Sequence, residues 1–183
     1  MASSFELLTK EGLVLTNRPA YQVPHFLFIV TFFWCLLALF IALGSQYFGG
    51  LAPCVLCHYQ RYPYAVGMVV SLIGVLFWPT RLMVILGIVC IAASGSVAFF
   101  HVGVEQAWWA GTTACAGNAL DPNQEPSRFI DLLRQKSMVR CDTPAWSWAG
   151  ISMAGYNLLY AVSGVILLGS VLWRFGRRKN NET

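Results

Sequence analysis

The sequence predicts an all-α membrane protein, a bundle of four transmembrane helices with two loops on one face of the membrane. Hydrophobic residues make up 57% of the 183 residues and charged residues only 11%, whereas a soluble domain carries about 25% charged residues. The polar residues are also clustered, and they leave four apolar stretches that are long enough to cross a bilayer. One bundle without a second domain therefore accounts for the chain.

The four apolar stretches are the expected membrane spans, and each must be helical because lipid offers backbone groups no hydrogen-bond partner. The expected spans are residues 26–44, 62–78, 82–100 and 149–173. The second is slightly short and could begin earlier, near Tyr59, and the last is long enough to tilt. The segments between and around them are an N-terminal tail (1–25), a first loop (45–61), a turn (79–81), a second loop (101–148) and a C-terminal tail (174–183).

The basic residues indicate how the bundle is oriented. Four spans place both termini and the turn at 79–81 on one face, which carries seven of the twelve Lys and Arg residues, and the other face carries five. A tight basic cluster, Arg174, Arg177, Arg178 and Lys179, follows the last span directly. The positive-inside rule then places the termini in the cytoplasm and both loops on the outer face. The net charge of +4 reflects this orientation, and we expect no nucleic-acid partner.

The cysteines divide along the same lines. Two of the six, Cys35 and Cys90, fall inside expected spans, where free cysteine packs as a small hydrophobe. The other four lie in the two outer loops, where disulfides form and persist: Cys54, Cys57, Cys115 and Cys141. Four cysteines allow three pairings, and the sequence does not choose among them.

Cys54 and Cys57 form a C-x-x-C motif at the mouth of the second span, and this spacing lets two sulfurs meet in an easily exchanged ring. Arg61 lies four residues after Cys57, so a helix beginning at Cys57 would place both on one face. A cation there stabilises the thiolate, which is the reactive species. Pro63 is acceptable in a first helical turn, and a helix that began only near Tyr62 would loosen this geometry.

Two further features of the outer face have a functional and a plain interpretation. His101 stands at the outer end of the third span, where an ionisable group is either a functional residue or an interfacial anchor. The stretch from Ser127 to Val139 alternates apolar and charged residues and predicts a short helix on the outer membrane surface. That helix could hold the second cysteine pair near the first, or bind a partner.

Other chemistries compete for the cysteines. Cys54 to His58 reads C-x-x-C-H, the attachment signature of c-type haem, but it lies almost at the lipid boundary and leaves the second pair unexplained. Zinc ligands could come from Cys54, Cys57, His58 and His101, yet two full thiol pairs on an oxidising face favour redox chemistry. We therefore expect no metal ion. Cys115 and Cys141 could also form a purely structural disulfide.

Three stretches between roughly Phe26 and Trp173 resemble the DsbB family of bacterial disulfide bond formation proteins. Pro53-Cys54-Val55-Leu56-Cys57 followed by Arg61 is similar to the quinone-side motif of that family. His101-Val102-Gly103-Val104-Glu105-Gln106 with Cys115 is similar to the exit of its third span. Arg140-Cys141-Asp142, with Trp148 and residues 150–157, is similar to the entry of its fourth span.

The resemblance implies a role for each cysteine. Cys115 would be attacked by a reduced periplasmic DsbA-like thiol oxidase, and its partner Cys141 would then exchange with Cys54. Cys57 would pass the electrons to ubiquinone or menaquinone through a thiolate charge-transfer complex. The reaction is thiol–disulfide exchange coupled to quinone reduction.

The resemblance also implies a cofactor site and a location. Arg61 would stabilise the Cys57 thiolate and the developing quinone anion, and His101 corresponds to the region that lines the quinone site. The protein would be a multi-pass protein of the bacterial inner membrane, with its active cysteines on the periplasmic side. Its partners would be the thiol oxidase, the quinone and the lipid bilayer.

Two other functions remain as alternatives. A quinone-linked thiol enzyme of the vitamin K epoxide reductase type also has four core helices and two cysteine pairs, but its C-x-x-C follows its loop cysteines. Here the C-x-x-C comes first, which favours the DsbB type. The non-enzymatic alternative is a membrane-anchored c-type haem carrier or a disulfide-stapled assembly subunit.

Overall fold

Four long helices and one short β-hairpin form the described part of the chain. The structure is a computed structural model that describes residues 24–112, 115 and 139–180. Its elements in chain order are α2 (His25–Tyr47), α3 (Val55–Leu76), α4 (Arg81–Glu105), β1 (Ser147–Trp148), β2 (Ile151–Ser152) and α6 (Met153–Asn180). The expected tail 1–25, apart from its last two residues, and the expected surface helix 127–139, apart from Val139, lie outside the described residues.

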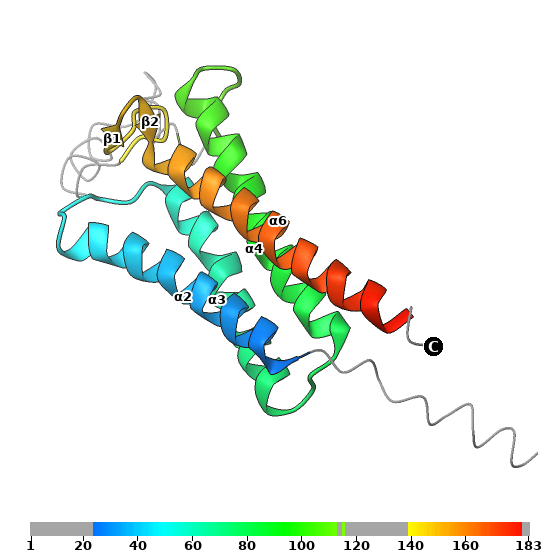
Figure 1. Ribbon diagram of the computed structural model, residues 1–183. Helices are drawn as coiled ribbons and strands as arrows, with labels where there is room; N and C mark the ends of the chain where they lie inside the picture. Colours follow the sequence, from blue (N-terminus) through cyan, green and yellow to red (C-terminus); the bar gives the residue numbers. More distant parts are fainter. Residues whose placement is uncertain (1–23, 113–114, 116–138, 181–183) are drawn as a thin grey trace, which may run out of the picture.

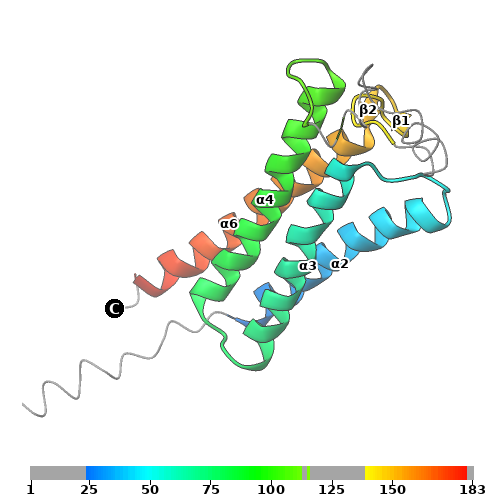
Figure 2. The same cartoon turned by 180° about the vertical axis from the view of Figure 1, so that it is seen from behind.

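The helices alternate in direction, so that successive connections lie at opposite ends of the bundle (Figures 1 and 2). Helix α3 packs against α2 and α4, and α4 also packs against α6. The loop before α3, the end of α4 and the β-hairpin share one end, whereas the turn before α4 and the C-terminus lie at the other (Figure 1). Cys54, Cys115 and Cys141, which come from the two loops, lie in one cluster at this end of the molecule.

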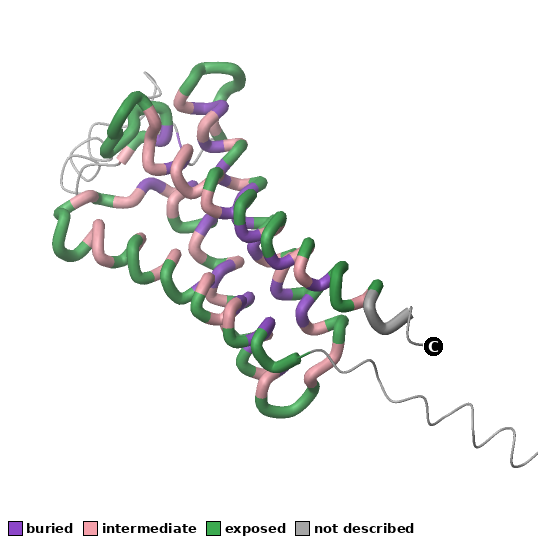
Figure 3. The backbone as a smooth tube through the Cα atoms, in the orientation of Figure 1, coloured by how far each residue is buried: buried purple, intermediate pink, exposed green. Residues whose placement is uncertain are grey.

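Three of the helices are long and apolar enough to cross a membrane: His25–Tyr47, Arg81–Glu105 and Met153–Arg177. Their outward faces carry large apolar side chains such as Phe40 (70% exposed) and Ile166 (65% exposed), and Figure 3 shows buried residues mainly where helices face one another. Exposed apolar surface on this scale is rare in soluble monomers and is expected where lipid covers it. The chain is therefore a helical membrane protein.

Helix α3 is the exception, because its first turns carry Gln60, Arg61 and three tyrosines and make it less apolar than the other three. It nevertheless has 22 residues, a length of about 33 Å at the rise of an α-helix. The bundle buries part of its polar N-terminal half against α4 and α6.

Helix α3 begins at Val55 rather than near Tyr62. Cys54 is its N-cap, and the Cys54 sulfur accepts a hydrogen bond from the Cys57 backbone N–H at 3.3 Å. Pro63 lies inside the helix, where it removes one backbone hydrogen bond without ending it. Cys57 and Arg61 consequently share one continuous helix, which is the geometry that the sequence argument required.

Helix α6 begins at Met153, four residues after the start that the apolar pattern indicates. Residues 147–152 form an antiparallel hairpin instead, in which Ser147 pairs with Ser152 and Trp148 pairs with Ile151. Its two turn residues, Ala149 and Gly150, both have positive φ, of 49° and 77°. A turn with two positive φ values matches the twist of paired strands. These residues therefore form a hairpin, although their hydrophobicity predicted the first turn of the last helix.

Small residues allow the helices to approach closely. A Cβ added at Gly95 of α4 would lie 2.9 Å from the Cβ of Ala161 on α6, closer than two carbon atoms can pack. Because the Ala161 Cβ is fixed to its backbone, no rotation relieves that contact. Close packing of backbones replaces the hydrophobic effect as the force between helices in lipid.

We predict that Gly95→Ala lowers the free energy of unfolding by about 1–3 kcal/mol, because α4 and α6 must move apart. Gly169→Ala is the matched control, since nothing lies within 4 Å of its added Cβ and it shares any gain in helix propensity. Detergent-induced unfolding followed by circular dichroism measures both. Equal stability of the two variants would show that this contact does not hold α4 to α6.

Candidate active site

The two cysteines of the C-x-x-C motif face each other at the start of α3. Their sulfur atoms lie 2.9 Å apart and share a hydrogen bond, and neither is in a disulfide. Cys54 is 4% exposed and Cys57 is half-buried. Both lie at the N-terminal end of a helix, whose partial positive charge stabilises a thiolate. The pair therefore stands in the reduced form with its sulfurs placed for exchange.

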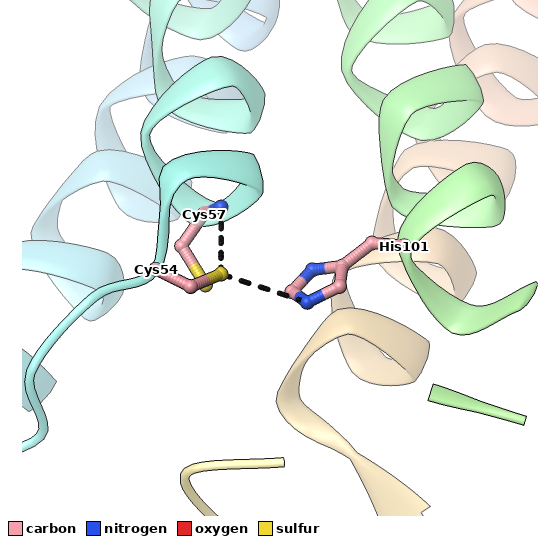
Figure 4. A group of neighbouring side chains, drawn as sticks. All are labelled: Cys54, Cys57 and His101. Atoms are coloured by element: carbon pink, nitrogen blue, oxygen red, sulfur yellow. Dashed lines mark hydrogen bonds between the residues drawn. The ribbon is translucent and has the colours of Figure 1, made fainter. Parts of the chain in front are cut away.

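His101 of α4 completes this group from across the bundle. Its Nε2 lies 3.6 Å from the Cys54 sulfur, and Figure 4 shows the imidazole ring directed at the two cysteines. One turn later, a carboxylate oxygen of Glu105 lies 3.8 Å from the same nitrogen, and the Ser152 hydroxyl donates to the other oxygen of Glu105. His101 therefore lies buried in contact with the cysteine pair, as a functional residue at this position would.

His58, the histidine of the haem-like string, is exposed and lies outside the group formed by Cys54, Cys57 and His101. A haem joined to both cysteines would have to displace the packing that buries Cys54. His58 is thus adjacent to the cysteines in sequence, whereas His101 is the histidine that contacts them in the folded protein.

The environment of Cys54 favours its thiolate. The hydrogen bond from the Cys57 side chain, and after it the hydrogen bond and charge of His101, hold the pKa of Cys54 well below the usual value, against the opposing effect of burial. These contacts therefore favour the thiolate form of Cys54 when the pair is reduced.

A chain of buried and half-buried polar groups contacts His101 at its second ring nitrogen. Gln60 Nε2 lies 2.9 Å from His101 Nδ1, and Asn157 Nδ2 donates to Gln60 Oε1 at 2.7 Å. The Tyr64 hydroxyl donates to Asn157 Oδ1 at 2.9 Å, and the Ser94 hydroxyl donates to the Gln60 backbone carbonyl at 2.8 Å. The chain links α3, α4 and α6 through side chains that have no other reason to be buried in an apolar bundle.

Sequence reasoning did not select Gln60, Tyr64, Ser94 or Asn157. The available signal was their polarity within otherwise apolar helices, together with the spacing of Gln60 and Tyr64 by four residues on one helix face. That signal marks candidates but does not show which helices bring them together.

Arg61 lies on α3 one turn beyond Cys57, but its guanidinium group is held by α2. It donates to Gln46 Oε1 at 2.6 Å and to the Ala42 carbonyl at 3.1 Å. Ala42 lies near the C-terminal end of α2, where the helix dipole favours a cation. Two of the five guanidinium N–H groups are used in these bonds, which leaves donors for a ligand beside the thiols.

The second cysteine pair is a disulfide between Cys115 and Cys141, with Cα atoms 5.1 Å apart. Both sulfurs are buried in one apolar cluster with Cys54, Leu56 and Val104. The backbone of Cys141 also lies against His101. The structure thus selects one of the three possible pairings and packs this disulfide beside the reduced pair.

A cavity of about 460 Å³ opens next to the reduced pair. It is lined mainly by apolar and aromatic side chains of α2, α3, α6 and the hairpin. Its polar lining includes Cys54, Cys57, Gln60, Arg61, His101 and Glu105. An apolar cavity of this size with a few convergent polar groups is typical of a small-molecule site.

The reduced pair, the neighbouring disulfide and the cavity together indicate a membrane-bound thiol–disulfide oxidoreductase. Comparison with known proteins agrees. The model of the family described as Disulfide bond formation protein DsbB matches residues 24–171. The chain therefore belongs to the DsbB family, whose members are membrane oxidoreductases of disulfide bond formation.

Individual relatives are similar over most of their length. Uncharacterized protein RP370 of Rickettsia prowazekii (strain Madrid E) is 28% identical over 159 residues, 86% of this chain and 91% of that protein. Disulfide bond formation protein B of Azoarcus sp. (strain BH72) is 28% identical over 162 residues, 83% of this chain and 93% of that protein. No solved structure matches the chain.

We predict that the reduced protein keeps a thiolate at about pH 6, where an ordinary thiol with a pKa of about 8.5 is almost wholly protonated. Because a lowered pKa preserves the charged form as the pH falls, the thiolate is lost only in more acidic solution. Removing His101 raises the pKa of Cys54, so His101→Ala moves the midpoint upward.

The measurement is the ultraviolet absorbance of thiolate during a pH titration, with Cys54→Ser to assign the signal. His58→Ala is the matched control and leaves the midpoint in place. A wild-type midpoint at the ordinary thiol value would show that the contacts of Cys54 do not stabilise its anion.

Proposed function

We propose that this protein reoxidises a periplasmic DsbA-like thiol oxidase and passes the electrons to a membrane quinone, ubiquinone or menaquinone. The observation that carries the proposal is the order of the groups at one end of the bundle. The disulfide Cys115–Cys141 packs against the pair Cys54 and Cys57, and that pair lines the cavity. Electrons that the Cys115–Cys141 disulfide accepts from a partner can thus pass to the Cys54 and Cys57 pair, and from that pair to a ligand in the cavity, without a large rearrangement.

In the first step, a thiolate of the partner attacks the sulfur of Cys115 and forms a mixed disulfide, which releases Cys141 as a thiolate. The second thiol of the partner then displaces Cys115, and the partner leaves oxidised. Each exchange forms one S–S bond and breaks one, so the two electrons of the partner now reside on Cys115 and Cys141. The contact of Cys141 with the cluster around Cys54 supports transfer between the two pairs.

In the second step, Cys141 attacks the Cys54–Cys57 disulfide at Cys54, and the pair becomes reduced as Cys115–Cys141 reforms. Cys54 and Cys57 would then give up two electrons and return to a disulfide. A quinone held in the cavity would accept these two electrons, and its two protons would come from the remaining thiol and from solvent, so the overall reaction would balance. Cys57 is half-buried at the cavity wall and is the sulfur from which we expect the electrons to leave.

The residues around the cavity fit a quinone. The apolar lining suits its ring and tail, and Arg61 and His101 provide polar groups for its oxygens. Arg61 is anchored to α2 and still has free N–H groups, so it can hold a developing anion without being pulled out of place. The chain from Gln60 to Tyr64 keeps the His101 ring oriented toward the thiols.

The proposal includes a location. With α3 as the fourth span, both termini lie in the cytoplasm and the cysteines lie on the periplasmic face of the bacterial inner membrane. The basic residues that follow the last span support this orientation. The polar start of α3 would then sit at the outer membrane boundary, at the same end of the bundle as the hairpin.

We predict that the purified protein reduces a soluble ubiquinone analogue when a reduced periplasmic thiol oxidase is added, and that Cys57→Ser abolishes this reaction. Cys90→Ser is the matched control, because it changes the same chemical group within α4 and away from the cavity. Quinone absorbance measures the turnover. Normal turnover by Cys57→Ser, or a haem spectrum in place of thiol-dependent turnover, would overturn the proposed function.

We predict that Arg61→Ala raises the quinone KM by about 10–150-fold, because a charge-assisted hydrogen bond worth about 1.5–3 kcal/mol is lost. Arg61→Lys keeps the charge and should recover part of the affinity. Arg174→Ala, an exposed cation at the other end of the bundle, is the control and leaves the KM unchanged. Unchanged quinone kinetics in Arg61→Ala would remove this side chain from the quinone site.

A further inference from the structure

Cys54, Cys57 and His101 also form the type of ligand set that binds a metal ion. The two sulfurs and the histidine nitrogen Nε2 all lie within 4.8 Å of one another (Figure 4). They come from two helices, with Cys54 and His101 each 4% exposed, so the bundle rather than a flexible loop brings them together. Among the residues that the structure describes, this is the one such group of three.

The spacing is close to what a tetrahedral ion requires. Zinc with Zn–S bonds of about 2.3 Å keeps its ligand atoms about 3.5–3.8 Å apart. The Cys54 sulfur and His101 Nε2 already lie 3.6 Å apart. The two sulfurs lie 2.9 Å apart and have to separate by about 1 Å, which a rotation of the half-buried Cys57 side chain provides.

The surroundings supply what a metal site needs beyond its ligands. Two thiolates neutralise a divalent cation, which lowers the cost of placing it in an apolar bundle. All three ligand residues line the cavity, so a fourth position is open to water, as in zinc sites with three protein ligands. The Glu105 carboxylate lies beside His101 Nε2, so it can offset the positive charge of the ion or bind the ion directly.

The polar chain behind His101 can adapt to such an ion. Metal binding at Nε2 requires the proton on Nδ1, which must then donate to Gln60. Gln60 and Asn157 each present both a donor and an acceptor, and the Tyr64 hydroxyl can act as either, so the whole chain can reverse its direction. A partner on the second ring nitrogen is a usual feature of metal-binding histidine.

We propose that the reduced pair Cys54 and Cys57, together with His101, binds Zn²⁺ or a similar thiophilic divalent cation, and that this blocks the site. Binding releases the remaining thiol protons and forms two metal–sulfur bonds and one metal–nitrogen bond, without any change of oxidation state. Oxidation of the pair to a disulfide removes both thiolates and releases the ion. The site is therefore open to metal only between the two halves of a redox cycle.

Cobalt provides a direct test, because Co²⁺ bound by thiolates in a tetrahedral site has intense charge-transfer and ligand-field absorption bands. We expect the reduced, detergent-purified full-length protein to show these bands and to lose them when Zn²⁺ is added. The oxidised protein should show none. Bands that persist in the oxidised protein would overturn the proposal.

Two histidine variants separate this site from adventitious binding. We expect His101→Ala to weaken Co²⁺ binding by at least about tenfold, since even outer partners of a metal ligand contribute 10–100-fold. His58→Ala, which removes the histidine adjacent to Cys57 in sequence, should leave binding unchanged. The opposite result, loss in His58→Ala and not in His101→Ala, would overturn the assignment. Circular dichroism and thiol counts establish that each variant is folded and reduced.

Metal binding does not depend on the proposed quinone activity, but the predicted inhibition does. In the turnover assay, Zn²⁺ should inhibit the wild-type protein reversibly, and a chelator should restore the rate. Cobalt bands without any turnover under chelator would contradict the proposed function and leave the metal site standing. Full turnover with no cobalt bands in the reduced protein would contradict the metal site alone.

Discussion

The placement of the Cys54 sulfur at the N-terminus of α3 is the constraint on which the site depends. That sulfur caps the helix, contacts Cys57 and meets His101 of the neighbouring helix. Capping starts α3 at Val55, and an early start in turn places Cys57 and Arg61 one turn apart on the same helix. A helix beginning at Tyr62 would have left the motif in a loop, without the helix dipole and without a fixed direction toward α4.

The bundle includes a buried polar chain that an apolar core would not need. Gln60, Asn157 and Ser94 come from three helices, and each has a partner, so their burial leaves no unsatisfied group in this network. Burying a connected network of polar groups in lipid costs far less free energy than burying the same groups without partners, and the network gives the helices one preferred register. Because its far end reaches His101, the register of the bundle and the state of the active thiols are physically linked.

The two cysteine pairs occupy complementary positions. Cys115–Cys141 lies outside the helices, whereas Cys54 and Cys57 lie at the start of α3 beside the cavity. The first arrangement suits exchange with a large protein partner, and the second suits transfer to a small apolar ligand in a fixed position. The contact of both pairs within one apolar cluster connects these two tasks.

The same features that stabilise a thiolate for exchange also create affinity for soft cations. A helix N-terminus, a neighbouring imidazole and a second thiol are shared by redox centres and by metal sites. The difference lies in whether the sulfurs can come together as a disulfide or stay apart around an ion. At this site the 2.9 Å separation of the sulfurs lies between the two states, and the 3.6 Å contact with His101 suits the second.

The sequence by itself determined the class of fold and the location of the chemistry. Long uncharged stretches require membrane helices, and their number and order bring Cys54, Cys57, Cys115 and Cys141 to one end, because each crossing reverses the direction of the chain. The family motifs then indicate thiol oxidoreductase chemistry. None of these conclusions depends on which helices are in contact.

Only the tertiary structure decided which groups meet. The contact of His101 with Cys54, the anchoring of Arg61 on α2 and the chain through Asn157 all depend on contacts between distant segments. The Cys115–Cys141 bond, which the family resemblance implied, is formed in the structure. Local hydrophobicity also placed the start of α6 four residues early, since it does not register the turn that residues 149 and 150 form. Periodicity and composition describe neighbouring residues along the chain. Tertiary packing decides which distant residues come into contact, and the chemistry of this site arises from those contacts.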